Sequence, residues 1–234
     1  MNKTANIVGL KMKFCNDDIL FNLFNEIFIH HENHFVTESK KPYIIDCGSN
    51  IGMSVLYFKM LYPDANILAF EPGEDAFACL DANIKSNWMN TVTANKIALA
   101  GREGSIDFYC DHDKPGSLIM STNPARMSKH KRVVKVTRLS NYIDCMVDFL
   151  KMDVEGTEME IMEDLFREGK LNYIRQMAIE YHHHIISDSN ELSRMLRLLE
   201  DAGFGYQIES NLKRPFSKGQ FQDILIYAYQ AMSC

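Results

Sequence analysis

The sequence predicts an α/β fold: a mostly parallel sheet with helices on both faces and an antiparallel hairpin at its end. Three observations predict it. Short apolar runs alternate with segments of helical periodicity through most of the 234 residues, and repeated strand–helix units form parallel sheets. The last two runs, 204–210 and 223–230, are joined by a loop. Acids end four of the runs, where parallel sheets bind ligands. These acids are Asp46, Glu71, Asp153 and Glu180.

Strands and helices alternate regularly in the first half of the chain. The apolar residues of 17–28 share one helical face, with Asp17 as the expected N-cap, and Tyr62 before Pro63 ends the second helix. The helices are predicted at 17–28, 53–61 and 74–87. The strands are predicted at 43–46, 66–71 and 92–100.

The second half begins with an interruption of this alternation. Strands at 105–110 and 132–139 flank a polar loop, and the alternation then resumes. Further strands are predicted at 147–153 and 174–181, and further helices at 157–169 and 191–203. We therefore expect a single domain over residues 1–234, with an N-terminal helical and strand extension at 1–40 and a strand–loop insertion at 99–146 near the active site.

Composition and charge exclude several classes of protein. A net charge of −6 argues against a general nucleic-acid binder. No apolar run reaches the length of a membrane span, and the N-terminal residues lack the apolar core of a signal peptide. The six cysteines contain no CxxC pair, which favours reduced thiols in the cytoplasm. The sequence does not indicate an oligomeric state.

The turn after the first buried strand has the composition of a nucleotide-binding turn. Gly48 and Gly52 allow a sharp turn and a close approach of backbone to ligand, and Asn50 tolerates a left-handed conformation. The helix that follows offers free N–H groups. A tight strand–helix turn without a ligand would need the same glycines, so the turn alone leaves both interpretations open.

The next strand ends in Glu71, nineteen residues after Gly52. A carboxylate at this point can accept hydrogen bonds from both hydroxyls of a ribose. It would repel a 2′-phosphate, which disfavours NADP. Between NAD and S-adenosylmethionine, the pattern D-x-G-x-N-x-G lacks the middle glycine of a dinucleotide turn. Asp46 would also be unfavourable beside a pyrophosphate but favourable beside the ammonium group of a methionine moiety.

These segments resemble those of the FkbM family of S-adenosylmethionine-dependent methyltransferases. The resemblance covers about residues 26–210, and its most specific segment is "DFLKMDVEGTE" at 148–158. Other matching segments are "IIDCGSNIGMSVLYFK", "YPDANILAFEP", "NKIALAGREGSIDFY" and "AIEYHHH". The resemblance implies a Rossmann-like seven-stranded methyltransferase sheet whose last two strands form the hairpin. Arg138 departs from the family, which more usually has threonine there.

The resemblance also implies roles for individual residues. The cofactor-binding set is Asp46, Gly48, Ser49, Asn50, Gly52, Glu71, Pro72, Ala98 and Asp153. Within it Glu71 would hold the ribose, Ala98 would contact the adenine, and Asp153 would stand at the methyl-transfer end. Glu180 and His182 would face Asp153 across the cleft, and Glu155 would contact the substrate.

Methyl transfer to a hydroxyl needs positioning and a general base. His182 is the first candidate because the unperturbed pKa of histidine is closest to neutral pH, with Glu180 or Asp153 orienting or replacing it. A structural role for His182 and a helix-capping role for Glu155 remain open. Ser117, on a polar loop, is a further substrate-binding candidate, although it is equally expected as a turn residue.

A metal ion is not expected, although the candidate acids and His182 are chemically capable of ligating a divalent cation. Basic segments at 126–132 and 212–218 are suited to a phosphate on the acceptor, or are simply solvated. The sequence therefore predicts a methyltransferase that uses S-adenosylmethionine and methylates a hydroxyl of a sugar, glycan or other small-molecule natural product. The alternatives are an NAD-dependent oxidoreductase and a non-catalytic S-adenosylmethionine-binding protein.

Overall fold

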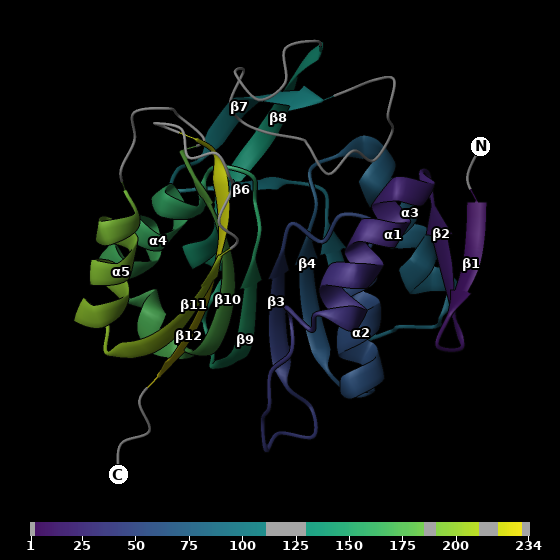
Figure 1. The fold of residues 1–234 in the computed structure, drawn as a ribbon, viewed down its shortest axis with the longest axis horizontal. Coiled ribbons are helices and arrows are strands. Elements are labelled where there is room, and N and C mark those ends of the chain that lie inside the picture. Colours follow the sequence, from purple (N-terminus) through teal and green to yellow (C-terminus); the bar gives the residue numbers. More distant parts are fainter. Residues whose placement is uncertain (1–2, 111–129, 185–190, 211–219, 231–234) are drawn as a thin grey trace.

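The computed structural model describes residues 3–110, 130–184, 191–210 and 220–230. Its centre is a seven-stranded sheet in the order β11-β12-β10-β9-β3-β4-β5, in which only β12 runs antiparallel to its neighbours (Figure 1). The fold class predicted from the sequence, including the terminal hairpin, is therefore confirmed. The strands are β3 (Tyr43–Cys47), β4 (Asn66–Phe70), β5 (Val92–Asn95), β9 (Val147–Met152), β10 (Ile174–His183), β11 (Phe204–Ser210) and β12 (Gln222–Gln230).

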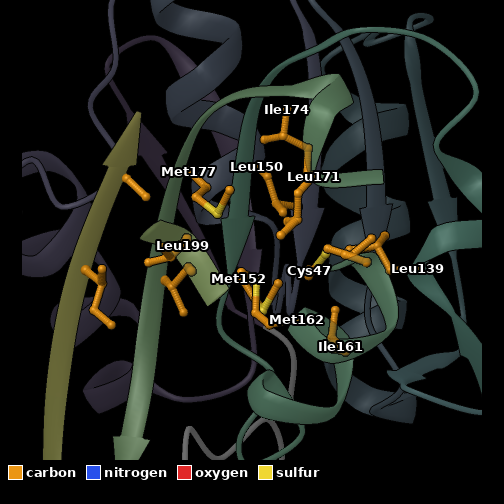
Figure 2. Packing of buried hydrophobic residues seen from close by; sticks show 14 of the residues in the cluster. Cys47, Leu139, Leu150, Met152, Ile161, Met162, Leu171, Ile174, Met177 and Leu199 are labelled. Atoms are coloured by element: carbon orange, nitrogen blue, oxygen red, sulfur yellow. The ribbon is translucent and has the colours of Figure 1, made fainter. Parts of the chain in front are cut away.

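Helices cover both faces of this sheet. On one face lie α1 (Asp17–Phe24), α2 (Met53–Leu61) and α3 (Glu74–Ser86), and on the other lie α4 (Glu158–Arg167) and α5 (Leu192–Asp201) (Figure 1). Each face has its own apolar core. Figure 2 shows the core beneath α4 and α5, where Leu150 and Met152 of β9 pack with Ile161 and Met162 of α4.

Alternation along β3 sends successive side chains to opposite faces of the sheet. In β3, Ile45 and Cys47 join the core beneath α4 and α5, whereas Ile44 joins the other core. Asp46, on the same face as Ile44, is paired in register with Lys151 of β9. The two opposite charges therefore face each other near the carboxyl ends of the two central strands.

The predicted strand 92–100 is divided between two sheets, which corrects the sequence-based assignment. Its first part is β5 in the central sheet, and its second part is β6 (Ala98–Ala100). β6 pairs with β8 (His130–Arg138), which also pairs with β7 (Gly104–Cys110). This small sheet lies at the carboxyl end of the central strands, above α4 in Figure 1.

The N-terminal residues form a hairpin, β1 (Lys3–Ile7) and β2 (Leu10–Phe14), followed by α1 and a π-helical turn at Asn25–Ile29. The prediction that Asp17 caps α1 is wrong. Asn16 is the N-cap, because it is extended and its side chain accepts a hydrogen bond of 2.8 Å from the Asp18 N–H. Two short 3₁₀ segments, Leu139–Tyr142 and Lys170–Tyr173, precede β9 and β10.

Within the described ranges, no helix combines the length and the apolar character that crossing a membrane requires.

Candidate active site

The strand order reverses between β3 and β9, since β4 and β5 lie beyond β3 while β10 lies beyond β9. Ligands of open parallel sheets bind at this point, beyond the carboxyl ends of the strands. A cavity of about 780 Å³, including its open mouth, lies there. Predicted cofactor residues that line it are Gly48, Ser49, Asn50, Glu71, Pro72, Ala98 and Asp153. Its wall combines apolar side chains with a few polar groups, as ligand sites usually do.

The glycine turn forms one wall of this cavity. Gly48 has a φ of +84°, and a β-carbon there would lie 1.7 Å from the Asp153 carbonyl oxygen. The N–H groups of Gly48 and Ser49 both donate to the Phe70 carbonyl, at 3.0 and 2.9 Å. The turn is thus held between the ends of β4 and β9, and only glycine fits at position 48.

Asp46 and Gly52 lie behind the cavity wall. Asp46 is fully buried, and its Oδ2 accepts a 2.6 Å hydrogen bond from Ser54. Gly52 precedes α2 with a φ of +89°, and a β-carbon there would lie 2.8 Å from Leu80 Cδ1. Asp46 is not among the residues that line the cavity, and its place beside the methionine ammonium stays a prediction. Both residues shape the turn from beneath it.

Lys151 is a site residue that the sequence analysis missed. Its side chain is buried, and its Nζ donates to the Gly48 carbonyl at 2.6 Å and to Asp153 Oδ2 at 3.2 Å. Asp46 Oδ1 lies 3.8 Å from the same nitrogen. Burial alone would lower the pKa of Lys151, but Asp153 and Asp46 raise it above its ordinary value. A lysine inside the buried run "VDFLKM" is the signal that was available in the sequence.

Glu71 is buried at the cavity wall, next to the glycine turn. Its Oε2 accepts a 2.9 Å hydrogen bond from the Asn50 N–H, and its Oε1 accepts one of 2.6 Å from the Gly73 N–H. Burial raises the pKa of Glu71 to about 7, and these two hydrogen bonds limit the rise. A carboxyl group with this pKa changes charge in the neutral range.

Carboxylates surround His182, which is 3% exposed. Its Nδ1 lies 2.7 Å from Glu158 Oε1, and Glu158 is itself buried. Its Nε2 lies 3.3 Å from Glu155 Oε2, 3.8 Å from Asp153 Oδ1 and 3.8 Å from Glu180 Oε1. Burial would lower the pKa of His182, but its carboxylate neighbours, Glu158 first among them, raise it well above its ordinary value.

A smaller cavity of about 360 Å³, including its open mouth, adjoins the first and shares four residues with it. The shared residues are Leu23, Ile27, Lys151 and Asp153. Acids dominate its polar wall: Glu26, Glu32, Asp153 and Glu180. Burial, followed by the charge of Glu32, raises the pKa of Glu26 to about 7. The second cavity therefore concentrates acidic groups beside the first.

The structure thus brings most of the predicted site residues to the same end of the sheet. Some of them line the cavities, and others lie behind the lining residues. Asp153 lines both cavities, Glu155 lines the larger, and Glu180 lines the smaller. His182 lines neither and lies behind the carboxylates. Ser117, the segment 212–218 and most of 126–132 lie outside the described residues.

A parallel sheet with this strand order, a glycine turn at the reversal and an acid ending the next strand define a Rossmann-like methyltransferase. The chain belongs to the FkbM methyltransferase family, whose domain model matches residues 46–206. It is therefore an S-adenosylmethionine-dependent methyltransferase, and the NAD-dependent and non-catalytic alternatives are set aside.

Two relatives agree with this assignment, and a solved structure shares the fold. The chain is 27% identical over 208 residues to Methyltransferase 1 of Beauveria bassiana (strain ARSEF 2860), covering 80% of this chain and 82% of that protein. It is 26% identical over 153 residues to the 2-O-methyltransferase NoeI of Sinorhizobium fredii (strain NBRC 101917 / NGR234), covering 57% and 61% respectively. The crystal structure of methyltransferase FkbM from Methylobacillus flagellatus KT superposes with a TM-score of 0.56 at 16% identity, covering 92% of this chain and 56% of that chain.

Proposed function

We propose that the protein transfers the methyl group of S-adenosylmethionine to a hydroxyl oxygen of a sugar, glycan or other small-molecule natural product. The observation that carries this proposal is the pair of adjoining cavities that share Asp153. The larger cavity holds the donor, and the smaller, acid-lined cavity receives the acceptor. The 2-O-methyltransferase NoeI, a relative over 57% of this chain, supports an oxygen acceptor.

The acids of the smaller cavity favour a hydroxyl acceptor over an amine and over an oxygen that has a phosphate beside it. Carboxylates next to an amine hold it in the protonated form, which has no electron pair for attack. A phosphate beside the reacting oxygen would be repelled by the same carboxylates. Hydroxyl groups are instead good hydrogen-bond donors to carboxylate oxygens. A phosphate on the acceptor would therefore lie away from the reacting oxygen.

The larger cavity supports a specific placement of the donor. Glu71, released from one of its backbone partners, accepts the ribose hydroxyls. Ala98, on β6, lines the cavity beside Ile97 and Leu99, and this apolar part of the wall suits the adenine ring. The glycine turn with Ser49 and Asn50 faces the methionine part of the donor, and Asp153 stands at its reactive end.

Donor affinity should depend on pH through Glu71. The carboxylate is the form that accepts two ribose hydrogen bonds, and the pKa of about 7 in the donor-free protein means that protons compete with the ribose below pH 7. Affinity should therefore fall by about tenfold from pH 8 to pH 6. Calorimetry with 5′-methylthioadenosine measures this cleanly, because that ligand has the ribose but no titrating amino acid. In Glu71→Gln the slope should vanish, and an unchanged slope would remove Glu71 from the ribose site.

The catalytic roles follow from which groups reach the acceptor. His182 was predicted as the general base, but it lines neither cavity and its Nδ1 is occupied by Glu158. We assign it to positioning the carboxylates around Nε2. Asp153 and Glu180 face the acceptor cavity, and Glu180 accepts the hydroxyl proton as the oxygen attacks the methyl carbon.

Product analysis tests the proposed function. The protein is incubated with S-adenosylmethionine labelled with ¹³C in its methyl group and a panel of glycans, polyols and amines. NMR of the product should show the label as an O-methyl group. Glu180→Gln should lower turnover by about 10²–10⁴-fold while donor affinity is retained. Glu209→Gln, on the exposed surface of β11, is the matched control and should keep parental turnover. Label on nitrogen or carbon alone would overturn the proposal.

A further inference from the structure

We infer that Asp153, Glu155 and His182 form a divalent metal site at the junction of the two cavities. This inference rests on the proposed function for the role of the metal, but not for its binding. The sequence predicted no metal. The structure, however, brings one ligand atom from each of these side chains within 4.8 Å of one another. A second group, Glu180, His182 and Asp223, overlaps the first at His182, so carboxylates approach the ring from two strands.

The hydrogen bond at Nδ1 of His182 sets which ring nitrogen donates a proton and which can bind a metal. A carboxylate accepts hydrogen bonds, so Glu158 at 2.7 Å requires that Nδ1 donates. This leaves Nε2 directed at the carboxylates of Asp153 and Glu155. When one nitrogen of a histidine binds a metal, the other usually donates a hydrogen bond to a group such as a carboxylate. Glu158 is held in turn by a 3.0 Å hydrogen bond from the Gly156 N–H.

The distances around Nε2 are longer than a charge-assisted hydrogen bond and are compatible with a shared metal ion. Nε2 is more than nine-tenths buried with its ring, and its neighbouring carboxylate oxygens lie 3.3 to 3.8 Å away. Charge-assisted N–H···O bonds are shorter, about 2.7–2.9 Å. By contrast, ligands bound to one Mg²⁺-like ion at about 2.1 Å are spaced about 3 Å apart when adjacent and about 4 Å when opposite. The observed spacing lies between these two values.

The backbone also directs the acids toward Nε2. Glu155 has a φ of +62°, which is uncommon for a residue other than glycine. Asp153 is divided between two partners, with Oδ2 toward Lys151 at 3.2 Å and Oδ1 toward His182 at 3.8 Å. The lysine therefore compensates one oxygen of Asp153 and leaves the other for a cation. One imidazole with two carboxylates suits Mn²⁺ better than Mg²⁺, which prefers oxygen ligands.

The position of the site gives the metal a role in the reaction. Asp153 and Glu155 both line the donor cavity, and Asp153 also lines the acceptor cavity. A cation held there would bind the acceptor hydroxyl and lower its pKa. The O–CH₃ bond then forms as the S–CH₃ bond breaks, sulfur keeps the electron pair, and Glu180 receives the proton.

Manganese binding tests the site without donor or acceptor. Protein treated with chelator and dialysed is titrated with MnCl₂, and the EPR signal of free Mn²⁺ reports the unbound ion. The parent should bind one Mn²⁺ per chain with saturation, and Glu155→Gln should bind at least about tenfold more weakly. Glu160→Gln removes a more exposed acid of α4 and should bind as the parent does. Thermal unfolding of each variant, with and without Mn²⁺, shows that it is folded, and only the variants that retain the site should be stabilised.

The outcomes separate this inference from the proposed function. If the parent binds no Mn²⁺ with saturation, or if Glu155→Gln binds it as the parent does, the metal site is overturned. If chelated protein still methylates a hydroxyl at the parental rate, the metal loses its role while the proposed function stands. If one Mn²⁺ binds as expected but the methyl group is found only on nitrogen, the proposed function fails while the site stands.

Discussion

Gly48→Ala is expected to lower the free energy of unfolding by more than about 4 kcal/mol. The added carbon would lie 1.7 Å from the Asp153 carbonyl oxygen, and both groups belong to backbone that is fixed at the ends of β3 and β9. Nothing in this contact is a flexible side chain that could move away. Urea denaturation measures the loss, and donor binding should be lost with it because the turn forms the cavity wall.

Gly203→Ala is the matched control for this substitution. Gly203 has a φ of +80°, close to the +84° of Gly48, but a β-carbon there would have no atom within 4 Å among the described residues. The control isolates the cost of the left-handed backbone, about 1–2 kcal/mol. If Gly48→Ala costs no more than Gly203→Ala, the close approach of the turn to Asp153 is wrong.

Lys151→Met is expected to cost about 3–5 kcal/mol of the free energy of unfolding. The lysine compensates the carboxylates of Asp46 and Asp153, and its hydrogen bond of 2.6 Å holds the Gly48 carbonyl. Asp46 Oδ1 already has no hydrogen-bond partner in the described part of the chain, and removing the lysine charge takes away the cation 3.8 Å from it. Donor affinity should also fall by at least about tenfold, because the turn loses its support from β9.

Lys59→Met is the control for this substitution. It removes a buried lysine without taking the positive charge away from buried carboxylates. Lys59 is also buried, but it donates to the carbonyls of Pro63 and Ala65, at 2.8 and 2.7 Å, and not to carboxylates. Its replacement should lower stability while donor affinity, measured where the variant is folded, stays at the parental value. A Lys151→Met variant as stable as the parent would show that the buried charges do not depend on the lysine.

Local patterns predicted the central sheet well because each strand is short, apolar and followed by a turn or a helix. The acids at strand ends, such as Glu71 and Asp153, could also be placed, since their position relative to a buried run is visible in the sequence. The division of residues 92–100 could not be predicted. The run reads as one strand, and only tertiary pairing with β8 draws Ala98–Ala100 away from β5.

The sequence also could not predict which site residues line the cavities and which lie behind them. Asp46 stands at the end of a buried run, as the cavity-lining acids do. Its side chain, however, faces Lys151 and Ser54 behind the cavity wall. His182 was predicted to be the general base from the ordinary pKa of histidine. In the structure its Nδ1 is hydrogen-bonded to Glu158, which is distant in the sequence. Such effects depend on which charges meet across elements, and a single sequence does not show this.

Calorimetric titration with S-adenosylhomocysteine and with NAD tests the central claim, that the cavity at the end of β3, β4 and β9 is a donor site built around Glu71. The parent should bind S-adenosylhomocysteine with one site per chain and NAD far more weakly. Glu71→Ala should weaken S-adenosylhomocysteine binding by about 1–3 kcal/mol, the cost of losing charge-assisted hydrogen bonds. Comparable binding of NAD by the parent, or parental affinity for S-adenosylhomocysteine in folded Glu71→Ala, would contradict the account.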